Sequence, residues 1–292
     1  MNRTTEEAHA KINTVLDVTG IRENGYHDVR MIMQELALCD DIMITKTEGE
    51  KITVHVTGGG SDIPCDERNI AVKAAGLLKE TFGIREGMHI ELLKRIPSAA
   101  GLGGGSADAA AVMRAGNRLF ELGEDPEKLA ELSVKIGADV PFCILGGTML
   151  SEGIGEVLTA LPPMAETPVL LVKPAENIST KTIYTSLDAV FQEVHHPDVE
   201  ACMEDLGRND LPALSAHTGN VLEEVTAALL PKIHEIEAFL KEKGAVLSMM
   251  SGSGPTVFGL FEKEETCSRA FAEIKTVFPD CEVVKTHTIR RN

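Results

Sequence analysis

The stretch PSAAGLGGGSADAAAVM, residues 97–113, contains four glycines within five positions and continues directly into an alanine-rich run. Glycines at positions 101, 103, 104 and 105 remove the side chains that would keep an anion away from the backbone. Apolar residues recur at helical spacing between Ser106 and Phe120, so the loop leads into a helix whose first N–H groups lack intrahelical partners. A tight strand-to-helix turn would also use glycine, but four glycines exceed what such a turn needs. The stretch therefore predicts a phosphate-binding loop.

Two common phosphate loops do not match this stretch. A Walker A loop requires Gly-Lys-Ser/Thr, and no lysine follows Gly105. The dinucleotide fingerprint G-x-G-x-x-G fails because Ser106 stands where the third glycine should be. The loop therefore belongs to another class of phosphate-binding protein.

Composition limits the possible partners. The chain has 292 residues with 43% apolar and 25% charged residues, which is typical of a globular protein, and its formal net charge is −17. An acidic chain is a poor match for nucleic acid or an anionic membrane, so we expect neither as a partner. No apolar run approaches the roughly 20 residues of a membrane span, and the first residues lack the apolar core of a signal peptide. We expect a cytoplasmic protein.

Strand-like and helix-like segments interleave along the whole chain, which predicts a mixed α and β fold. Short alternating runs between residues 42 and 56 and the segment 88–96 indicate strands. The segment 125–137 predicts a helix with Asp125 as N-cap, Pro126 at the first position and Gly137 just past its end. A proline-rich stretch at 158–168 predicts a boundary between an N-terminal domain, 1–160, and a C-terminal domain, 161–292.

The form P-x-x-x-G-L-G-G-G-S resembles the phosphate loop of the GHMP kinases, a family named for galactokinase, homoserine, mevalonate and phosphomevalonate kinases. Six further blocks occur in the family's order: AKIN at 10–13, GYH at 25–27, DERN at 66–69, KRIP at 94–97, GADVPFCILGGTMLSEGIGE at 137–156 and MSGSGPTVF at 250–258. The loop followed by DAAA is most similar to the branch that acts on 4-diphosphocytidyl-2-C-methylerythritol in the non-mevalonate isoprenoid pathway. The resemblance implies an α+β, two-domain fold with the active site in the cleft between the domains.

The same resemblance implies an ATP-dependent kinase that phosphorylates the 2-hydroxyl of that cytidine diphosphate derivative, with Mg²⁺ entering as the ATP complex. Asp139 matches the family's catalytic aspartate and would take the proton of the substrate hydroxyl. Lys11 would lie beside it, keeping the carboxylate ionised and polarising the hydroxyl. From the residues alone, Asp139 as a helix C-terminal or turn residue and Lys11 as a surface charge are the commoner outcomes.

The resemblance also assigns binding residues. Residues expected at the nucleotide are Asn69, Lys94, Pro97, Gly101, Leu102, Gly103, Gly104, Gly105, Ser106 and Ala107. Asn69 could equally be a helix N-cap. Ala107 replaces the family's second loop serine, so one possible contact to phosphate or Mg²⁺ is lost. His9 likewise stands where the family usually has the proline before AKIN.

On the substrate side, the resemblance implies that Tyr26 and Tyr184 stack on the two faces of cytosine, that His27 reads the base edge and that Asn13 binds near Lys11. Stacking contributes roughly 1–3 kcal/mol per base. Ordinary packing is the alternative for both tyrosines, which are the only two in a chain without tryptophan.

Two other functions stay open at this point. One is a GHMP kinase for another small alcohol of the homoserine or mevalonate type, which has no base to stack on. The other is an inactive nucleotide-binding sensor. No metal ligands are assigned, and we expect a monomer or weak homodimer.

Overall fold

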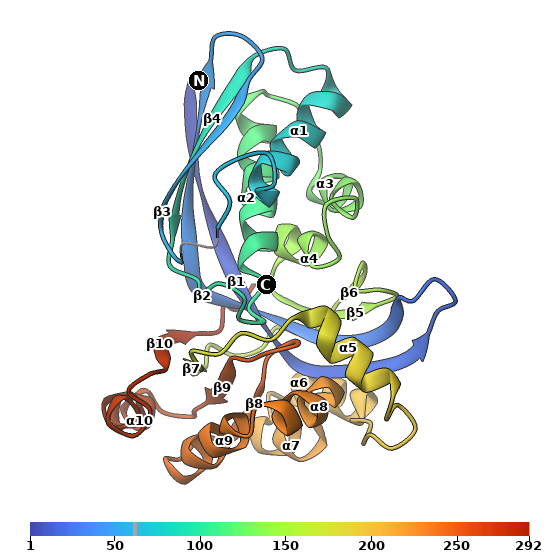
Figure 1. Ribbon diagram of the computed structural model, residues 1–292, viewed down its shortest axis with the longest axis vertical. Helices are drawn as coiled ribbons and strands as arrows, with labels where there is room; N and C mark the ends of the chain where they lie inside the picture. Colours follow the sequence, from blue (N-terminus) through green and yellow to red (C-terminus); the bar gives the residue numbers. More distant parts are fainter. Residues whose placement is uncertain (61–62, 292) are drawn as a thin grey trace. The chain divides into compact units, whose positions relative to one another are not determined.

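The computed structural model describes residues 1–60 and 63–291 and has the α+β fold that the sequence predicts (Figure 1). Its strands are β1 (Arg3–Ile21), β2 (His27–Thr47), β3 (Ile52–Gly58), β4 (Gly87–Lys94), β5 (Thr148–Glu152), β6 (Val157–Ala160), β7 (Pro168–Lys173), β8 (Leu247–Met250), β9 (Val257–Leu260) and β10 (Glu282–His287). Its helices are α1 (Ile70–Phe82), α2 (Gly104–Leu119), α3 (Pro126–Ser133), α4 (Val140–Leu145), α5 (Thr180–Asp188), α6 (Val199–Arg208), α7 (Leu211–His217), α8 (Val221–Leu229), α9 (Lys232–Glu242) and α10 (Glu264–Val277).

The strands form two sheets. In the first, the order is β3-β4-β2-β5-β6, and β1 also pairs with β2. Strands β3 and β4 are parallel, whereas β2 pairs antiparallel with β4 and with β5. The second sheet has the order β10-β7-β9-β8 and is antiparallel throughout.

The chain divides into two compact units that interleave along the sequence. Unit 1 comprises Met1–Lys11, Leu38–Ser98 and Gly103–Gly146, and unit 2 comprises Ile12–Ala37, Ala99–Leu102 and Gly147–Asn292. Strands β1 and β2 therefore contribute residues to both units. The predicted division at residues 160 and 161 stays a prediction.

In unit 1, helices α1 to α4 gather on one side of β3 and β4 (Figure 1). The alanine-rich run after the glycine loop forms α2, in which Ala107 and Ala109–Ala111 are buried. Small side chains on this helix allow close approach to α1 and α4, which both pack against it. The alanine-rich run after the glycine loop is thus a buried helix in the core of unit 1.

In unit 2, the four-stranded sheet is covered by helices at several points. Helix α10 packs against β7 and β10, and α9 packs against β8 and β9. All residues of β8 and β9 are buried, as expected for strands covered in this way.

Two details differ from the sequence prediction. Helix α3 ends at Ser133, because residues 134–136 continue as turns, so Gly137 is not its C-terminal glycine. Asp125 is its N-cap as predicted, although its side chain bonds none of the described backbone N–H groups there. The long strands β1 and β2 were not predicted over most of their length, because both faces are buried over long stretches and no alternation marks them.

Candidate active site

The glycine loop reaches α2 through Gly103, its N-cap residue. Gly103 has φ 69°, a left-handed conformation that a residue with a Cβ adopts only with strain, and its carbonyl accepts the N–H of Ala107 at 2.8 Å. A Cβ built on Gly103 would stand 2.9 Å from Cγ of Lys11. Glycine is therefore required here both by the backbone angle and by the lysine beside it.

Lys11 and Asp139 form an ion pair in unit 1. Lys11 Nζ lies 3.5 Å from Asp139 Oδ2, and the Lys11 side chain is 5% exposed while that of Asp139 is 31% exposed. Asp139 precedes α4, yet its carboxylate caps none of the described N–H groups at that terminus. The carboxylate is thus held by the lysine and remains open to solvent, as a proton acceptor for a bound hydroxyl must be.

Lys94 ends β4 beside the start of α2. Its Nζ bonds Asp108 Oδ2 at 2.7 Å and also Asp40 Oδ2, and it would lie 3.5 Å from a Cβ on Gly104. Burial raises the pKa of the Asp108 carboxyl to about 8 against the opposing charge of Lys94, and Asp40 adds to the rise. Burial lowers the pKa of Lys94, but the opposing charges of Asp108 and Asp40 outweigh it and raise that pKa, so the lysine stays charged next to the glycine loop.

Asp40 holds the connection between β4 and the glycine loop through backbone hydrogen bonds. It is fully buried, and its Oδ1 accepts the backbone N–H groups of Arg95 at 2.5 Å and Ile96 at 2.8 Å. These bonds fix the backbone just before Pro97, which is itself buried. Lys94 and the entry to the loop are thus positioned by one carboxylate.

Asn69 acts as the N-cap of α1. Its Oδ1 accepts the N–H of Ala71 at 2.9 Å, and its Nδ2 donates to the carbonyl of Pro64 at 2.7 Å. Both polar atoms of the Asn69 side chain are thus bonded, and the structure shows the N-cap role that the sequence analysis gave as the alternative. A contact to nucleotide stays a prediction.

The residues after Gly104 differ in exposure. Gly105 is exposed and Ser106 is partly exposed, whereas Ala107 is 1% exposed. The hydroxyl missing at Ala107 would have stood at a buried position of α2.

In unit 2, the loop residue Gly101 lies against the turn between β8 and β9. Ser251 Oγ donates to the carbonyl of Gly101 at 3.0 Å, and a Cβ on Gly101 would collide with the carbonyl oxygen of Ser251. The N–H of Asn13 in turn donates to Ser251 Oγ at 3.4 Å. Asn13 and Leu102 are both buried. The MSGSGPTVF block thus packs against the first glycine of the loop.

Tyr184 of α5 and His27 of β2 form an aromatic pair in unit 2. Their ring centroids are 4.6 Å apart with a tilt of 41°. His27 Nε2 also lies 2.7 Å from Asp188 Oδ1, so the imidazole is held on two sides. Tyr26 is 59% exposed. These three rings come from the two segments that the sequence predicted to bind cytosine.

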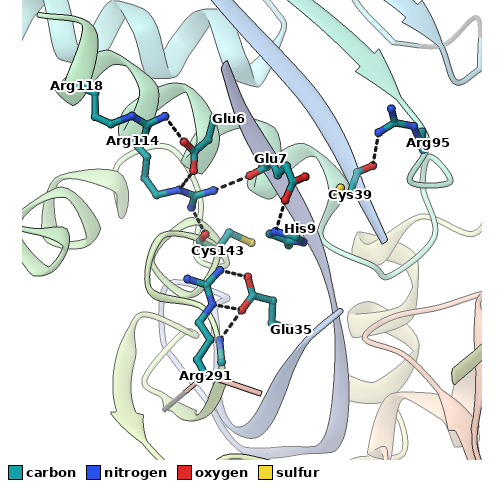
Figure 2. A network of polar contacts seen from close by, with 11 residues as sticks. Glu6, Glu7, His9, Glu35, Cys39, Arg95, Arg114, Arg118, Cys143 and Arg291 are labelled. Carbon is teal, nitrogen blue, oxygen red and sulfur yellow. Dashed lines mark hydrogen bonds and ion pairs between the residues drawn. The ribbon is translucent and has the colours of Figure 1, made fainter. Parts of the chain in front are cut away.

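Arg114 of α2 connects the two elements that carry Lys11 and Asp139. Figure 2 shows its guanidinium between β1 and α4, where it donates to Glu6 Oε1 at 2.8 Å and to the carbonyls of Glu7 and Cys143. Arg118 adds a second ion pair to Glu6. The ion pairs join β1 to α2, and the hydrogen bond to Cys143 joins α2 to α4, so Arg114 links the strand of Lys11 with the helix that follows Asp139.

Comparison with known families identifies the chain. The model of the GHMP kinase N-terminal domain matches residues 69–147, and that of the GHMP kinase C-terminal domain matches residues 197–280. The chain belongs to the GHMP kinase family.

Similar proteins agree with this family. A 4-diphosphocytidyl-2-C-methyl-D-erythritol kinase of Lachnoclostridium phytofermentans is 48% identical over 92% of this kinase and 91% of its own length. A crystal structure of 4-(cytidine 5'-diphospho)-2C-methyl-D-erythritol kinase matches with TM-score 0.80 and 31% identity over 98% of this chain and 99% of that one. A homoserine kinase from Cytophaga hutchinsonii has TM-score 0.79 at 19% identity, covering 99% of this chain and 95% of that one, which shows the shared fold. Family membership confirms the two-domain GHMP kinase fold and ATP as co-substrate.

Two positioning residues of this GHMP kinase were missed by sequence reasoning. Asp40 interrupts the buried face of β2, and a charged residue within a strand was the available signal. Asp188, at the end of α5, stands four residues after Tyr184, so it lies on the same helix face as the tyrosine. None of the helices in the described part of the chain has both the length and the hydrophobicity of a membrane span.

Proposed function

We propose that this kinase transfers the γ-phosphoryl group of ATP to the 2-hydroxyl of 4-diphosphocytidyl-2-C-methyl-D-erythritol, giving the 2-phosphate and ADP. The observation that carries the proposal is the Lys11–Asp139 ion pair, whose lysine lies against Gly103 of the phosphate loop. Relatives with 48%, 46% and 45% identity that bear this enzyme name support the choice of substrate.

Asp139 acts as the base in this proposal. Its carboxylate accepts the proton of the attacking hydroxyl as the O–P bond to the γ-phosphorus forms and the bond to the β–γ bridging oxygen breaks. The ammonium of Lys11 stabilises the negative charge on the hydroxyl oxygen as the proton leaves. The positive end of the α2 dipole and the backbone N–H groups of the loop hold the phosphates in line.

Mg²⁺ accompanies ATP in the proposal as a partner of the phosphates. The carboxylates nearest the loop, Asp40 and Asp108, both bind Lys94. Both oxygens of Asp40 are engaged, and Asp108 Oδ1 is the one oxygen of the pair that makes no hydrogen bond within the described part of the chain. A single free oxygen does not fit a dedicated magnesium site, which needs several oxygen ligands at octahedral positions. We therefore assign no protein ligand to the ion and route no step through it.

The base of the substrate binds at the rings of unit 2. Tyr26 and Tyr184 stack on cytosine, and His27, oriented by Asp188, reads its edge. Asn13 binds the substrate near the reacting hydroxyl. A kinase of homoserine or mevalonate type would have no use for this aromatic group, because those substrates carry no base.

We also propose that the enzyme works in the cytoplasm, where ATP is supplied, as a monomer or weak homodimer. Light scattering at micromolar concentration distinguishes these states from a stable larger oligomer.

An assay with three acceptors tests the proposed activity. ATP consumption and phosphate transfer are measured with the cytidine diphosphate substrate, with homoserine and with mevalonate at equal concentrations. We expect transfer to the cytidine substrate alone. Faster transfer to either small alcohol would replace the proposal with the second type of GHMP kinase, and ATP binding without transfer to any acceptor would indicate the sensor.

A further inference from the structure

Three side chains that can ligate a metal gather between α8 and α9 of unit 2. One ligand atom each from Glu223, His234 and Glu237 can be chosen so that all three lie within 4.8 Å of one another. Glu237 is only 7% exposed, and its Oε2 lies 3.2 Å from Nδ1 of His234. The His234 side chain is 62% exposed, so the group opens to solvent at the imidazole.

One oxygen of this group lacks a partner. Glu237 Oε1 is buried and makes no hydrogen bond within the part of the chain that the structure describes. An oxygen of Glu223 lies within 4.8 Å of an oxygen of Glu237, so two carboxyl groups share this place. A buried carboxylate oxygen without a donor is unfavourable, so either a shared proton or a cation must satisfy it.

The imidazole of His234 favours a cation over a shared proton. A shared proton needs only the two carboxyl groups, whereas here an imidazole joins them from the same face of α9, three residues before Glu237. Two carboxylates and one imidazole are ligands that Zn²⁺ takes, and three protein ligands leave the fourth position to water. Mg²⁺ is a poorer match because it prefers six oxygen ligands.

We propose that Glu223, His234 and Glu237 bind one divalent transition-metal ion, with Zn²⁺ as the probe, at the junction of α8 and α9. The ion's charge balances the two carboxylates and satisfies Glu237 Oε1.

The contacts of Glu223 link the site to the MSGSGPTVF block, residues 250–258. Glu223 Oε2 accepts the N–H of Met250 at 2.6 Å, at the end of β8. Asn220, the N-cap of α8, donates to the carbonyls of Met250 and Gly252. An ion that fixes Glu223 therefore fixes the start of the turn that lies against Gly101.

The experiment uses the full chain, stripped with a chelator and carrying Cys39→Ser. This background is needed because Glu7, His9 and Cys39 form a second donor group within 4.8 Å. Zn²⁺ is titrated by calorimetry, and melting temperature and hydrogen exchange at the Met250 amide are measured with and without the ion. We expect one ion per chain, a higher melting temperature and slower exchange at Met250, with no comparable effect of Mg²⁺ at the same concentration.

His234→Ala is the decisive variant, since an exposed side chain can be removed without unfolding the chain. Zn²⁺ affinity should fall by at least the roughly tenfold to hundredfold typical of losing even an outer-shell partner. His195→Ala is the matched control, because His195 is an exposed histidine beside a glutamate, Glu224, outside the group. Absence of Zn²⁺ binding, unchanged affinity in His234→Ala, or equal binding of Mg²⁺ would overturn the proposal, and the first result would leave a shared proton as the explanation.

Discussion

The side chain of Lys11 lies in the space that a Cβ on Gly103 would need. An ideal Cβ there would stand 2.9 Å from Cγ and 3.2 Å from Cε of the lysine. The glycine loop and Lys11 thus lie against each other, and the position of one constrains the other.

Gly103→Ala should therefore impair catalysis through Lys11 as well as through the loop. The left-handed conformation alone costs an alanine roughly 1–2 kcal/mol, and a displacement of Lys11 by about 1 Å can lower kcat about a hundredfold. Thermal melting and steady-state kinetics measure both effects. The control is Gly105→Ala, whose Cβ would meet only Ile70 Cγ2 at 3.4 Å and whose φ is ordinary. Equal damage by the two variants would contradict a special role of the Lys11 contact.

Asp139→Asn should bind both substrates and turn over slowly. Asparagine keeps the shape of the side chain but cannot accept the proton, and loss of a general base typically lowers the rate by ~10²–10⁴. Single-turnover rate, both affinities and melting temperature are measured together. Asp125→Asn is a matched control, because Asp125 is also a helix N-cap whose side chain bonds no described N–H there. A near-normal single-turnover rate in folded Asp139→Asn would remove the aspartate from the mechanism.

Tyr26→Ala offers the cleanest test of cytosine stacking, since an exposed ring contributes little to stability. We expect KM for the cytidine substrate to rise about tenfold to hundredfold, from the roughly 1–3 kcal/mol of one stacked base, with KM for ATP unchanged. Tyr184→Ala should have the same effect on KM but also loosen His27, whereas Tyr184→Phe should be nearly silent. If both KM values rose equally, the rings would be packing residues.

Asp108 should make stability depend on pH. Burial raises the pKa of Asp108 from its ordinary 3.8 to about 8 in the folded protein, so its contribution to stability is fully present below pH 3.8 and is lost as pH rises through 8. Wild-type melting temperature should accordingly fall more between pH 6 and pH 9 than that of Asp108→Asn. Asp41→Asn is the control, because Arg95 lowers the pKa of Asp41 and this group stays ionised across that range. If melting temperature changed with pH equally in wild type and Asp108→Asn, the raised pKa of Asp108 would be refuted.

The parts of the site that sequence predicted are those that short segments determine. The loop from Gly101 to Gly105 and the helix after it follow from local glycine and alanine content, and the Lys11–Asp139 pair followed from family motifs. Asp40 could not be predicted as a positioning residue, because its partners Lys94 and Ile96 lie more than fifty residues away in sequence. Asp188 was missed for a similar reason, since its contact with His27 spans 161 residues.

Strands β1 and β2 show a second limit. Where both faces of a strand are buried, the alternation of apolar and polar residues from which strands are usually predicted is lost. Only the C-terminal part of β2 was therefore recognised. The end of α3 was predicted at Gly137 but lies at Ser133. Residues 134–136 form a turn whose sequence continues the pattern of the helix.

The interleaved units have a consequence for how the chain folds as it is synthesised. All of unit 1 lies within the first 146 residues and can fold once they have emerged. Unit 2 includes Ile12–Ala37, yet the contacts of this segment reach residues made much later: Glu35 pairs with Arg291, 256 positions away, and Leu36 forms a bridge with Thr288. The segment 12–37 must therefore wait, with apolar residues exposed, until residues 288–291 have left the ribosome. Nascent chains halted between residues 147 and 280 should be the species that chaperones bind.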